Sequence, residues 1–279
     1  MPVTAAFPPA LWLLAGFFIV SPSLLGSPVR HASGQASTQV AQTSVQTSSV
    51  LQQAVAALLG YTVLSDVTLS GTAHRIAGSE DDTGTVTYRA TSGGAVRYDF
   101  SYSSGPQIEV HAAASSGPVG MWSGPDGVTH SLALHNLTNR ADIFPSFTLA
   151  PLVSAANLTV MLVGVETKNT HSVYHVSVFQ QAPQLKPKSA ALFHHLTQTE
   201  IFLDTSTLLP VALDFTTHPD DDAGVDIPVE LAFSDYRSVA GAQIPFRVQK
   251  YLNNGLVLDL QFQTASVNSG LSASLFNVQ

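Results

Sequence analysis

The sequence VRYDFSY, residues 96–102, alternates apolar or aromatic side chains with polar ones. Successive side chains of a β-strand point to opposite faces, so this segment predicts a strand with one aromatic face and one polar face. Turn sequences flank it, Ser92-Gly93-Gly94 before and Ser104-Gly105-Pro106 after. Short strands between tight turns indicate an antiparallel meander rather than βαβ units.

The same alternation recurs on both sides of this segment, and the pattern predicts about ten strands in all. Asn253-Asn254-Gly255 predicts a tight hairpin, because Asn and Gly tolerate positive φ. The continuous apolar run Leu158 to Val165 predicts a strand buried on both faces. Further alternating sets are Val67 and Leu69; Val86 and Tyr88; Val211, Leu213 and Phe215; Val229, Leu231 and Phe233; Ile244, Phe246 and Val248; and Leu256, Leu258, Leu260 and Phe262.

Three segments predict helical structure. Val50 to Leu59 carries apolar residues at helical spacing, and Gly60 follows as a C-terminal cap. Phe144 to Ala156 is strongly apolar but contains two prolines, which predicts a broken helix lying on the sheet. Ala190 to Leu196 predicts a helical turn.

Composition excludes several classes of function. Hydrophobic residues make up 45 % of the 279 and charged residues 11 %, against a usual charged share of about 25 %, so the body of the chain should fold. The net charge is −8 and the four lysines form no basic face, which argues against nucleic acid as a partner. The absence of cysteine excludes disulfides, cysteine-ligated zinc and thiol catalysis.

The N-terminal region predicts an exported protein, periplasmic or secreted, of a bacterial envelope. Ala10 to Val20 is an uncharged apolar run that is shorter than the roughly 20 residues of a membrane-spanning helix. It is typical of a signal peptide, which we assign to residues 1–34, with cleavage near Ala32-Ser33-Gly34 or near Ser27. An uncleaved membrane anchor is the alternative. Residues 35–49 predict a flexible polar tail, and residues 50–279 a single β-rich domain.

Ten histidines raise the question of a metal site. His171 and His175 lie on a predicted strand, where residues four apart are separated by about 13 Å and cannot share one ion. The adjacent His194 and His195 diverge on either a strand or a helix. The acidic stretch 220–226 resembles the start of a calcium loop, but its twelfth position is Leu231 instead of Glu, so a solvated acidic hairpin loop is favoured. The sequence therefore predicts no metal site and no cofactor.

No motif indicates catalysis. Residues 120–124, GMWSG, have the wrong spacing for a serine elbow, and neither a Walker loop nor a dinucleotide-binding glycine motif is present. No catalytic residue is assigned. A hydrolase built on His and Asp side chains that folding brings together is kept as an alternative.

The aromatic strand faces suggest an apolar binding site. On the concave side of a curved sheet they would line a pocket for an apolar ligand, and the alternative is an ordinary filled core. The candidate lining residues are Phe100, Phe215, Phe233, Phe246 and Phe262.

Three segments of the last third of the chain, within residues 200–276, share a family pattern: Glu200–Asp204 followed by Leu209-Pro210-Val211, then Phe233–Phe246, and Val267–Phe276. Together these segments resemble the LolA/LolB-like superfamily of outer-membrane lipoprotein carriers. This resemblance implies an incomplete, strongly curved β-barrel closed by helices, with an apolar cavity for acyl chains. Residues 50–59 and 144–156 would then be the covering helices.

The predicted fold class is therefore mostly β (α+β), a curved antiparallel sheet with one or two covering helices. We expect a non-catalytic envelope protein whose partners are a lipid or another apolar ligand, lipoproteins or envelope proteins, with membrane contact. The alternative is a structural or protein-interaction module of the envelope with a filled core.

Overall fold

The computed structural model describes residues 49–115, 117–155 and 157–278. The expected signal peptide and nearly all of the expected polar tail lie outside these residues. Thirteen strands make up most of the described chain, against about ten expected. They are β1 (Asp66–Ala77), β2 (Glu80–Thr91), β3 (Val96–Tyr102), β4 (Gly105–Ala114), β5 (Gly117–Ser123), β6 (Thr129–Ser131), β7 (Leu158–Lys168), β8 (His171–Gln180), β9 (Thr199–Asp204), β10 (Pro210–Thr217), β11 (Ile227–Val239), β12 (Ala242–Leu252) and β13 (Gly255–Val267).

Helices occupy the remaining regular segments. A helix over residues 49–59 confirms the predicted amphipathic helix, and Gly60 ends it with a φ of 56°. The other helices are η1 (Leu134–Leu137), α2 (Pro145–Ser154), α3 (Pro187–Thr197) and η2 (Ala273–Phe276). No helix among the described residues combines the length and apolar character that a membrane crossing requires.

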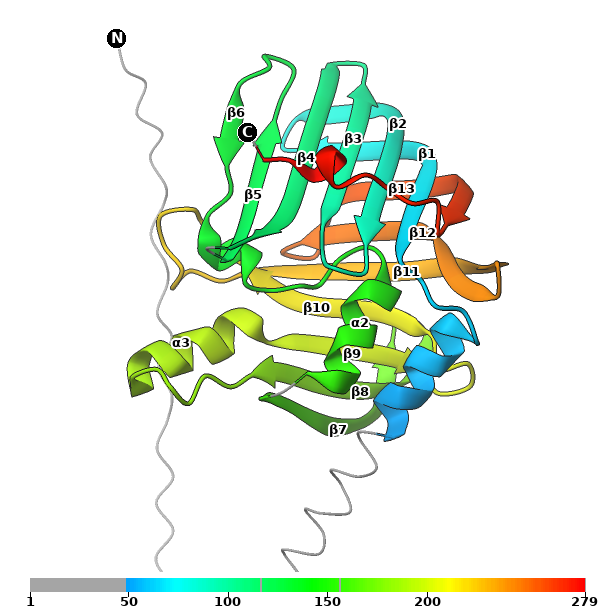
Figure 1. Ribbon diagram of the computed structural model, residues 1–279, viewed down its shortest axis with the longest axis vertical. Coiled ribbons are helices and arrows are strands. Elements are labelled where there is room, and N and C mark those ends of the chain that lie inside the picture. Colours follow the sequence, from blue (N-terminus) through cyan, green and yellow to red (C-terminus); the bar gives the residue numbers. More distant parts are fainter. Residues whose placement is uncertain (1–48, 116, 156, 279) are drawn as a thin grey trace, which may run out of the picture.

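All thirteen strands belong to one antiparallel sheet with the order β6-β5-β4-β3-β2-β1-β13-β12-β11-β10-β9-β8-β7 (Figure 1). Strands that follow one another along the chain pair within each of two meanders, β1 to β6 and β7 to β13. The pairing of β1 with β13 joins the two meanders. The order has two ends, so the sheet does not close into a barrel, and the predicted curved, incomplete architecture is confirmed.

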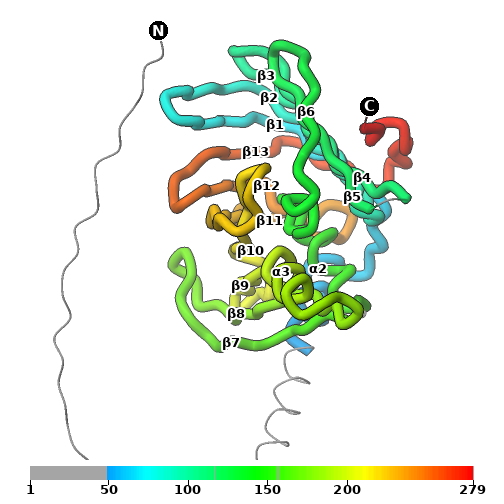
Figure 2. Tube along the Cα trace, turned by 90° about the vertical axis from the view of Figure 1, so that its left-hand side faces the viewer, coloured from blue at the N-terminus to red at the C-terminus, as the bar shows by residue number. Residues whose placement is uncertain are grey.

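The sheet curls around one face, as Figure 2 shows. Two glycines sit where neighbouring strands approach too closely for a side chain. A Cβ on Gly71 of β1 would lie 2.1 Å from the Gln261 carbonyl oxygen, and a Cβ on Gly84 of β2 would lie 2.1 Å from the Ser101 carbonyl oxygen. The register of β1 against β13 also shifts between Ser70 and Gly71. Glycines and bulges at such positions let a sheet bend sharply.

The main core lies between the inner face of the sheet and the helices. Leu51, Ala54 and Leu58 form the buried stripe of the first helix, at the i, i+3 and i+7 spacing of one helical face. Phe144 and Leu149 bring α2 into the same core. A helix was expected over residues 144–156 and is present, but α2 continues through Pro151, so the expected break does not occur. The segment of residues 132–154 thus connects the two ends of the open sheet, β6 and β7.

One predicted strand differs in its surroundings. Leu158 to Val165 was expected to be buried on both faces, but β7 is the last strand of the sheet and exposes Met161, Val163 and Val165. An apolar run in sequence does not distinguish a central strand from an edge strand, because both kinds of strand have the same backbone conformation. The prediction that this strand is buried on both faces was therefore wrong.

A hydrogen-bonded clamp holds the start of β1 to the segment after β13. The buried Asp66 carboxylate accepts hydrogen bonds from the backbone N–H groups of Ser269 and Gly270 and from the Ser269 hydroxyl. The Asn268 side chain accepts from the Ser65 backbone N–H and donates to the Val63 carbonyl. Burial raises the pKa of Asp66, but the hydrogen bonds from Ser269, Gly270 and Ser65 outweigh it and leave that pKa below its usual value.

The close approach at Gly71 predicts that Gly71→Ala destabilises the protein by about 3 kcal/mol, because the new methyl group overlaps backbone atoms of β13. Urea unfolding followed by far-UV circular dichroism measures the loss. Gly93→Ala is the matched control, because its methyl group would meet no atom closer than 3.7 Å. Equal stability of the two variants would contradict the assigned cause of the sheet's curvature.

The clamp predicts a pH-dependent loss in Asp66→Asn. At pH 7 the variant should lose about 1–3 kcal/mol, because an amide satisfies the surrounding donors poorly. The folded-state pKa of Asp66 lies below its unfolded value of about 3.9, so wild-type stabilisation is present above that value and disappears as the pH falls through the folded pKa. Urea titrations at pH 7 and at about pH 2 should show the two proteins converging in acid.

Candidate functional site on the inner face of the sheet

The five predicted lining residues all contribute to one core on the inner face. Phe233, Phe246 and Phe262 are fully buried in it, whereas Phe100 and Phe215 are only partly buried and pack against it. The guanidinium of Arg237 lies over the Phe246 ring at 4.2 Å from its centroid. Phe100 and Phe215 are therefore the two of the five whose side chains keep accessible surface on this face.

A row of aromatic rings crosses the inner face from β2 to β3. The rings of Tyr88 and Tyr98 lie 5.0 Å apart, Tyr98 and Phe100 are stacked at 5.8 Å, and Phe100 and Tyr102 are stacked at 5.2 Å. The alternation of residues 96–102 places the last three rings on the same side of β3, as the sequence predicted. The row gives this part of the inner face a continuous aromatic surface.

A partly buried carboxylate ends this row on one side. Asp142 precedes α2 and accepts hydrogen bonds from the hydroxyls of both Tyr88 and Tyr98, the second at 2.5 Å. The backbone N–H of Ile143 also donates to Asp142. Burial raises the pKa of Tyr88 and of Tyr98 well above the usual value, and the negative charge of Asp142 raises both further. Both phenols therefore stay protonated and serve as donors.

Three ionisable side chains share the inner face with these rings. In the sheet register Glu109 of β4 lies opposite Tyr98, His111 lies opposite Val96, and Lys250 of β12 lies opposite Leu231. Directly paired residues of antiparallel strands point to the same face, and Tyr98, Val96 and Leu231 all belong to the inner core. The charge of Lys250 acts on both Glu109 and His111 although the three belong to opposite halves of the sheet.

Glu109 and His111 form a hydrogen-bonded pair, with Nε2 of His111 at 2.7 Å from Oε1 of Glu109. Desolvation raises the pKa of Glu109, but the hydrogen bond and charge of His111 and the charge of Lys250 reverse this and lower it. Desolvation lowers the pKa of His111, but the contacts with Glu109 outweigh it and the pKa rises. Both shifts favour a carboxylate paired with an imidazolium.

The surroundings of this pair are enclosed and yet reachable. The side chains of Glu109 and His111 expose 41 % and 36 % of their surface. Desolvation by the surrounding protein is nevertheless the largest single influence on the pKa of each. Side chains that are surrounded by protein and still accessible to solvent are characteristic of a concave binding surface.

A separate groove of about 460 Å³ lies over strands β10 to β12 and the β7–β8 and β12–β13 turns. Its lining mixes polar residues such as Glu230 and Gln249 with the apolar Val211 and Ala232. Of the five predicted phenylalanines, Phe233 alone borders this groove. The groove is therefore not the pocket that the five phenylalanines were predicted to line.

The histidines singled out in the sequence lie in different places. His171 and His175 are both on β8 and bind different carboxylates, Asp204 and Glu200, at 2.9 and 2.8 Å. His194 and His195 do diverge, because His194 stacks on Phe179 at 3.5 Å while His195 contacts Asp226. The segment 220–226 is the loop between β10 and β11, as expected, but Asp226 is engaged by histidines.

Sequence reasoning missed the ionisable part of the inner face. On β4 the polar residues Gln107, Glu109 and His111 alternate with Ile108 and Val110. Such alternation ordinarily predicts that the polar side chains face solvent. Here the pattern is inverted because the C-terminal segment crosses the outer face of this part of the sheet: the Arg97 guanidinium donates to the Leu275 carbonyl, and Val110 is fully buried. The inward orientation of these polar side chains follows from the strand pairing and not from the sequence of β4 alone.

Comparisons with known proteins support the fold. No family model matches the chain, and no curated protein matches its sequence. A domain described as that of an outer membrane lipoprotein-sorting protein from Vibrio parahaemolyticus superposes with a TM-score of 0.55 at 12 % identity, over 84 % of this chain and 97 % of that one. A DUF1329 family protein from Desulfovibrio piger gives 0.55 at 10 % identity over the same shares.

A LolA superfamily protein from Nitrosomonas europaea superposes with a TM-score of 0.52 at 12 % identity, covering 83 % of this chain and 97 % of that one. Identities this low show the fold alone. The fold is LolA-like, as the resemblance of residues 200–276 implied.

The two tyrosine hydroxyls predict the effect of Asp142→Ala. The variant leaves two buried donors without their acceptor, which should lower the free energy of unfolding by about 3 kcal/mol. Urea unfolding measures the loss, and near-UV circular dichroism reports the release of the tyrosines. Asp126→Ala, in an exposed loop where the carboxylate accepts from the Val128 N–H, should stay within about 0.5 kcal/mol of wild type. Equal losses would show that Asp142 does not anchor the aromatic row.

Proposed function

We propose that this protein binds a lipid or another amphipathic molecule on the inner face of its curved sheet. The observation that carries the proposal is the combination found there. Partly exposed aromatic rings lie on the same face as ionisable side chains that are enclosed by protein but reachable by solvent. An apolar surface next to a small number of placed polar groups is the usual composition of a small-molecule site.

The aromatic row supplies the apolar contact. Phe100 and Phe215 are the proposed contact residues, and Phe233, Phe246 and Phe262 form the buried layer that supports them. Each CH₂ group of an acyl chain that leaves water contributes about 0.8 kcal/mol. A chain of a dozen carbons therefore offers about 10 kcal/mol before the entropic costs of association.

The ionisable groups supply the polar contact. Lys250 and the His111 imidazolium carry positive charge, and Glu109 carries negative charge, on the face that the aromatic row crosses. In this proposal they meet the polar end of the ligand while the rings meet its apolar end. The amphipathic ligand would then be oriented by charge and retained by burial of its chain.

The structural neighbours support the same class of ligand. Among the proteins that share this fold, one is described as an outer membrane lipoprotein-sorting domain and one as a LolA superfamily protein. In the proposal, lipids or the acyl chains of lipoproteins are the ligands, and the signal peptide predicted over residues 1–34 directs the protein to the cell envelope, where it has contact with membranes. The binding function is non-catalytic.

A second candidate is a protein-interaction module of the envelope. Strand β7 ends the sheet and exposes Met161, Val163 and Val165. An exposed edge strand with apolar side chains is a common place for another chain to bind. In this alternative the inner face is a filled core, and the aromatic row serves stability alone.

We expect a bound apolar molecule when the protein is purified from its own envelope under mild conditions, and native mass spectrometry followed by organic extraction would identify it. Delipidated protein should bind a dansylated fatty acid, detected by its fluorescence increase. Phe100→Ala and Phe215→Ala should each weaken this binding about tenfold, because each loses about 1.4 kcal/mol of apolar contact.

Tyr251→Ala is the matched control, since it removes a partly buried aromatic ring that borders the separate groove instead. Thermal unfolding by circular dichroism checks that each variant is folded at the assay temperature. A protein that is empty after mild purification and does not bind the probe would contradict the proposal and favour the interaction module. Equal weakening by Tyr251→Ala would place the probe away from the inner face.

A further inference from the structure

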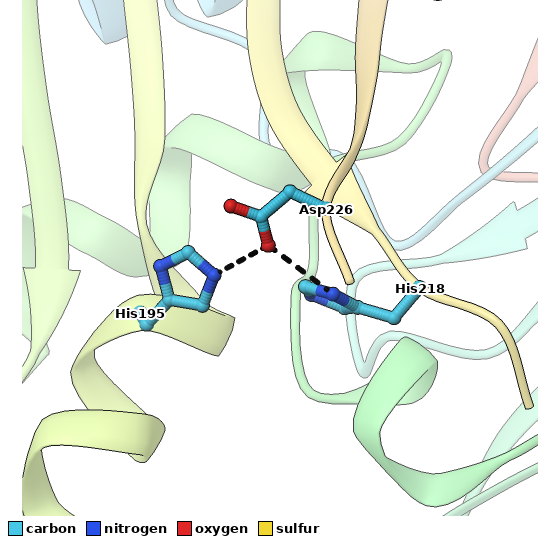
Figure 3. Close-up of side chains that lie close together, drawn as sticks. All are labelled: His195, His218 and Asp226. Atoms are coloured by element: carbon cyan, nitrogen blue, oxygen red, sulfur yellow. Dashed lines mark hydrogen bonds and ion pairs between the residues drawn. The ribbon is translucent and has the colours of Figure 1, made fainter. Parts of the chain in front are cut away.

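Two histidines and an aspartate from three separate segments meet beside the end of helix α3. Figure 3 shows His195, from the last turn of α3, and His218, which follows β10, on either side of the Asp226 carboxylate that precedes β11. Nε2 of His195 lies 2.7 Å from Oδ1 of Asp226, and Nδ1 of His218 lies 3.5 Å from the same oxygen. All three ligand-type atoms lie within 4.8 Å of one another.

We propose that His195, His218 and Asp226 bind a divalent transition-metal ion, Zn²⁺ in the first place. Two imidazole nitrogens and one carboxylate oxygen are a ligand set that Zn²⁺ takes in proteins, with a water molecule in the fourth position. Bonds of about 2.0–2.2 Å place tetrahedral ligand atoms about 3.3 Å from one another. The two separations from the Asp226 oxygen, 2.7 and 3.5 Å, lie on either side of this value.

The position of His218 is fixed by its neighbours. Its side chain is almost completely buried, and Asn136 of η1 holds the backbone on both sides: the Asn136 amide oxygen accepts from the His218 N–H at 2.9 Å, and its amide nitrogen donates to the His218 carbonyl at 2.8 Å. A buried imidazole on a fixed backbone provides one preorganised ligand. His195 and Asp226 expose 41 % and 45 % of their side chains and can adjust around the ion.

Ligation would change the hydrogen bonds of His218. Nδ1 donates to the Val225 carbonyl at 3.0 Å, and Nε2 lies 3.4 Å from the Thr216 hydroxyl oxygen. When Nδ1 binds the metal, the hydrogen bond to Val225 is given up, and the proton resides on Nε2 and is donated to Thr216. Ligand histidines generally donate their other ring N–H to an oxygen in this way, which orients the imidazole.

The rest of the loop favours a cation. Asp220, Asp221 and Asp222 lie in the same connection between β10 and β11, and their negative charge increases the local concentration of divalent ions. Other His–carboxylate contacts in the described chain lack a second imidazole: His74 meets Asp81 and His171 meets Asp204. Among the described residues, two imidazoles and a carboxylate come together at His195, His218 and Asp226.

A bound ion would tie α3 to the β10–β11 hairpin, so two measurements test the proposal. Protein made without a polyhistidine tag and stripped with a chelator should bind one equivalent of Zn²⁺ in isothermal titration calorimetry, with a dissociation constant in the micromolar range or below. Zn²⁺ at saturation should raise the thermal unfolding midpoint of wild type. Co²⁺ in place of Zn²⁺ should give the visible absorption of a tetrahedral centre.

His195→Ala and Asp226→Asn should each weaken Zn²⁺ binding at least about tenfold and abolish the thermal stabilisation. Both side chains are partly exposed, so the variants should fold, and circular dichroism without metal checks this. His171→Ala is the matched control, because it removes an imidazole from a His–Asp pair on β8. The absence of one-to-one binding in wild type, or equal binding by all variants, would show that the three residues form a hydrogen-bonded network only.

Discussion

The antiparallel pairing of β1 with β13 is the contact on which the rest of the structure depends. Each of the two meanders forms from strands that are neighbours along the chain, and this one pairing makes them a single sheet with a continuous inner face. Leu69 of β1 and Phe262 of β13 belong to the same core. The buried Asp66 carboxylate and the exposed Asn268 amide hold the end of this pairing through hydrogen bonds to the backbone, so the register is fixed by polar as well as apolar contacts.

The curvature of the sheet decides what the inner face can hold. At Gly71 and Gly84 the strands approach so closely that the sheet bends, and the bend brings β4 opposite β12. Only then do Glu109 and His111 come under the influence of Lys250. Charged side chains on a core-facing surface are costly unless they are paired or hydrated, and here they are both. The aromatic row and its Asp142 anchor lie on the same surface.

Much of the architecture was predictable from sequence because local chemistry and global fold agree in those places. The alternation of residues 96–102 gave the correct inner face of β3, and Asn253 and Asn254 both adopt the positive φ that the hairpin prediction required. The segments within residues 200–276 that resemble the LolA/LolB-like superfamily correctly implied the fold. The helix of residues 49–59 followed from a simple apolar stripe.

What the sequence did not reveal depends on contacts between distant segments. The polar side of β4 faces inward because the C-terminal segment covers its other side, and β7 is an edge strand because of its place in the sheet order. The group at His195 draws on a helix, a strand end and a loop, and the sequence reasoning therefore predicted no metal site. His218 was not singled out at all, because no spacing rule connects it to His195 or Asp226.

The central position of β1 and β13 also has a consequence for the way the chain reaches this structure. Ser65 and Asn268, which the clamp joins, are 203 positions apart. Pairing of the two strands must overcome the loop-closure entropy of nearly the whole described chain, whereas most hairpins of the two meanders close a short loop. Until that closure, β1 and β13 are both unpaired strand edges, and such edges readily associate with other chains. The pairing with the largest loop-closure cost is thus also the one that removes two of the four strand edges of the separate meanders.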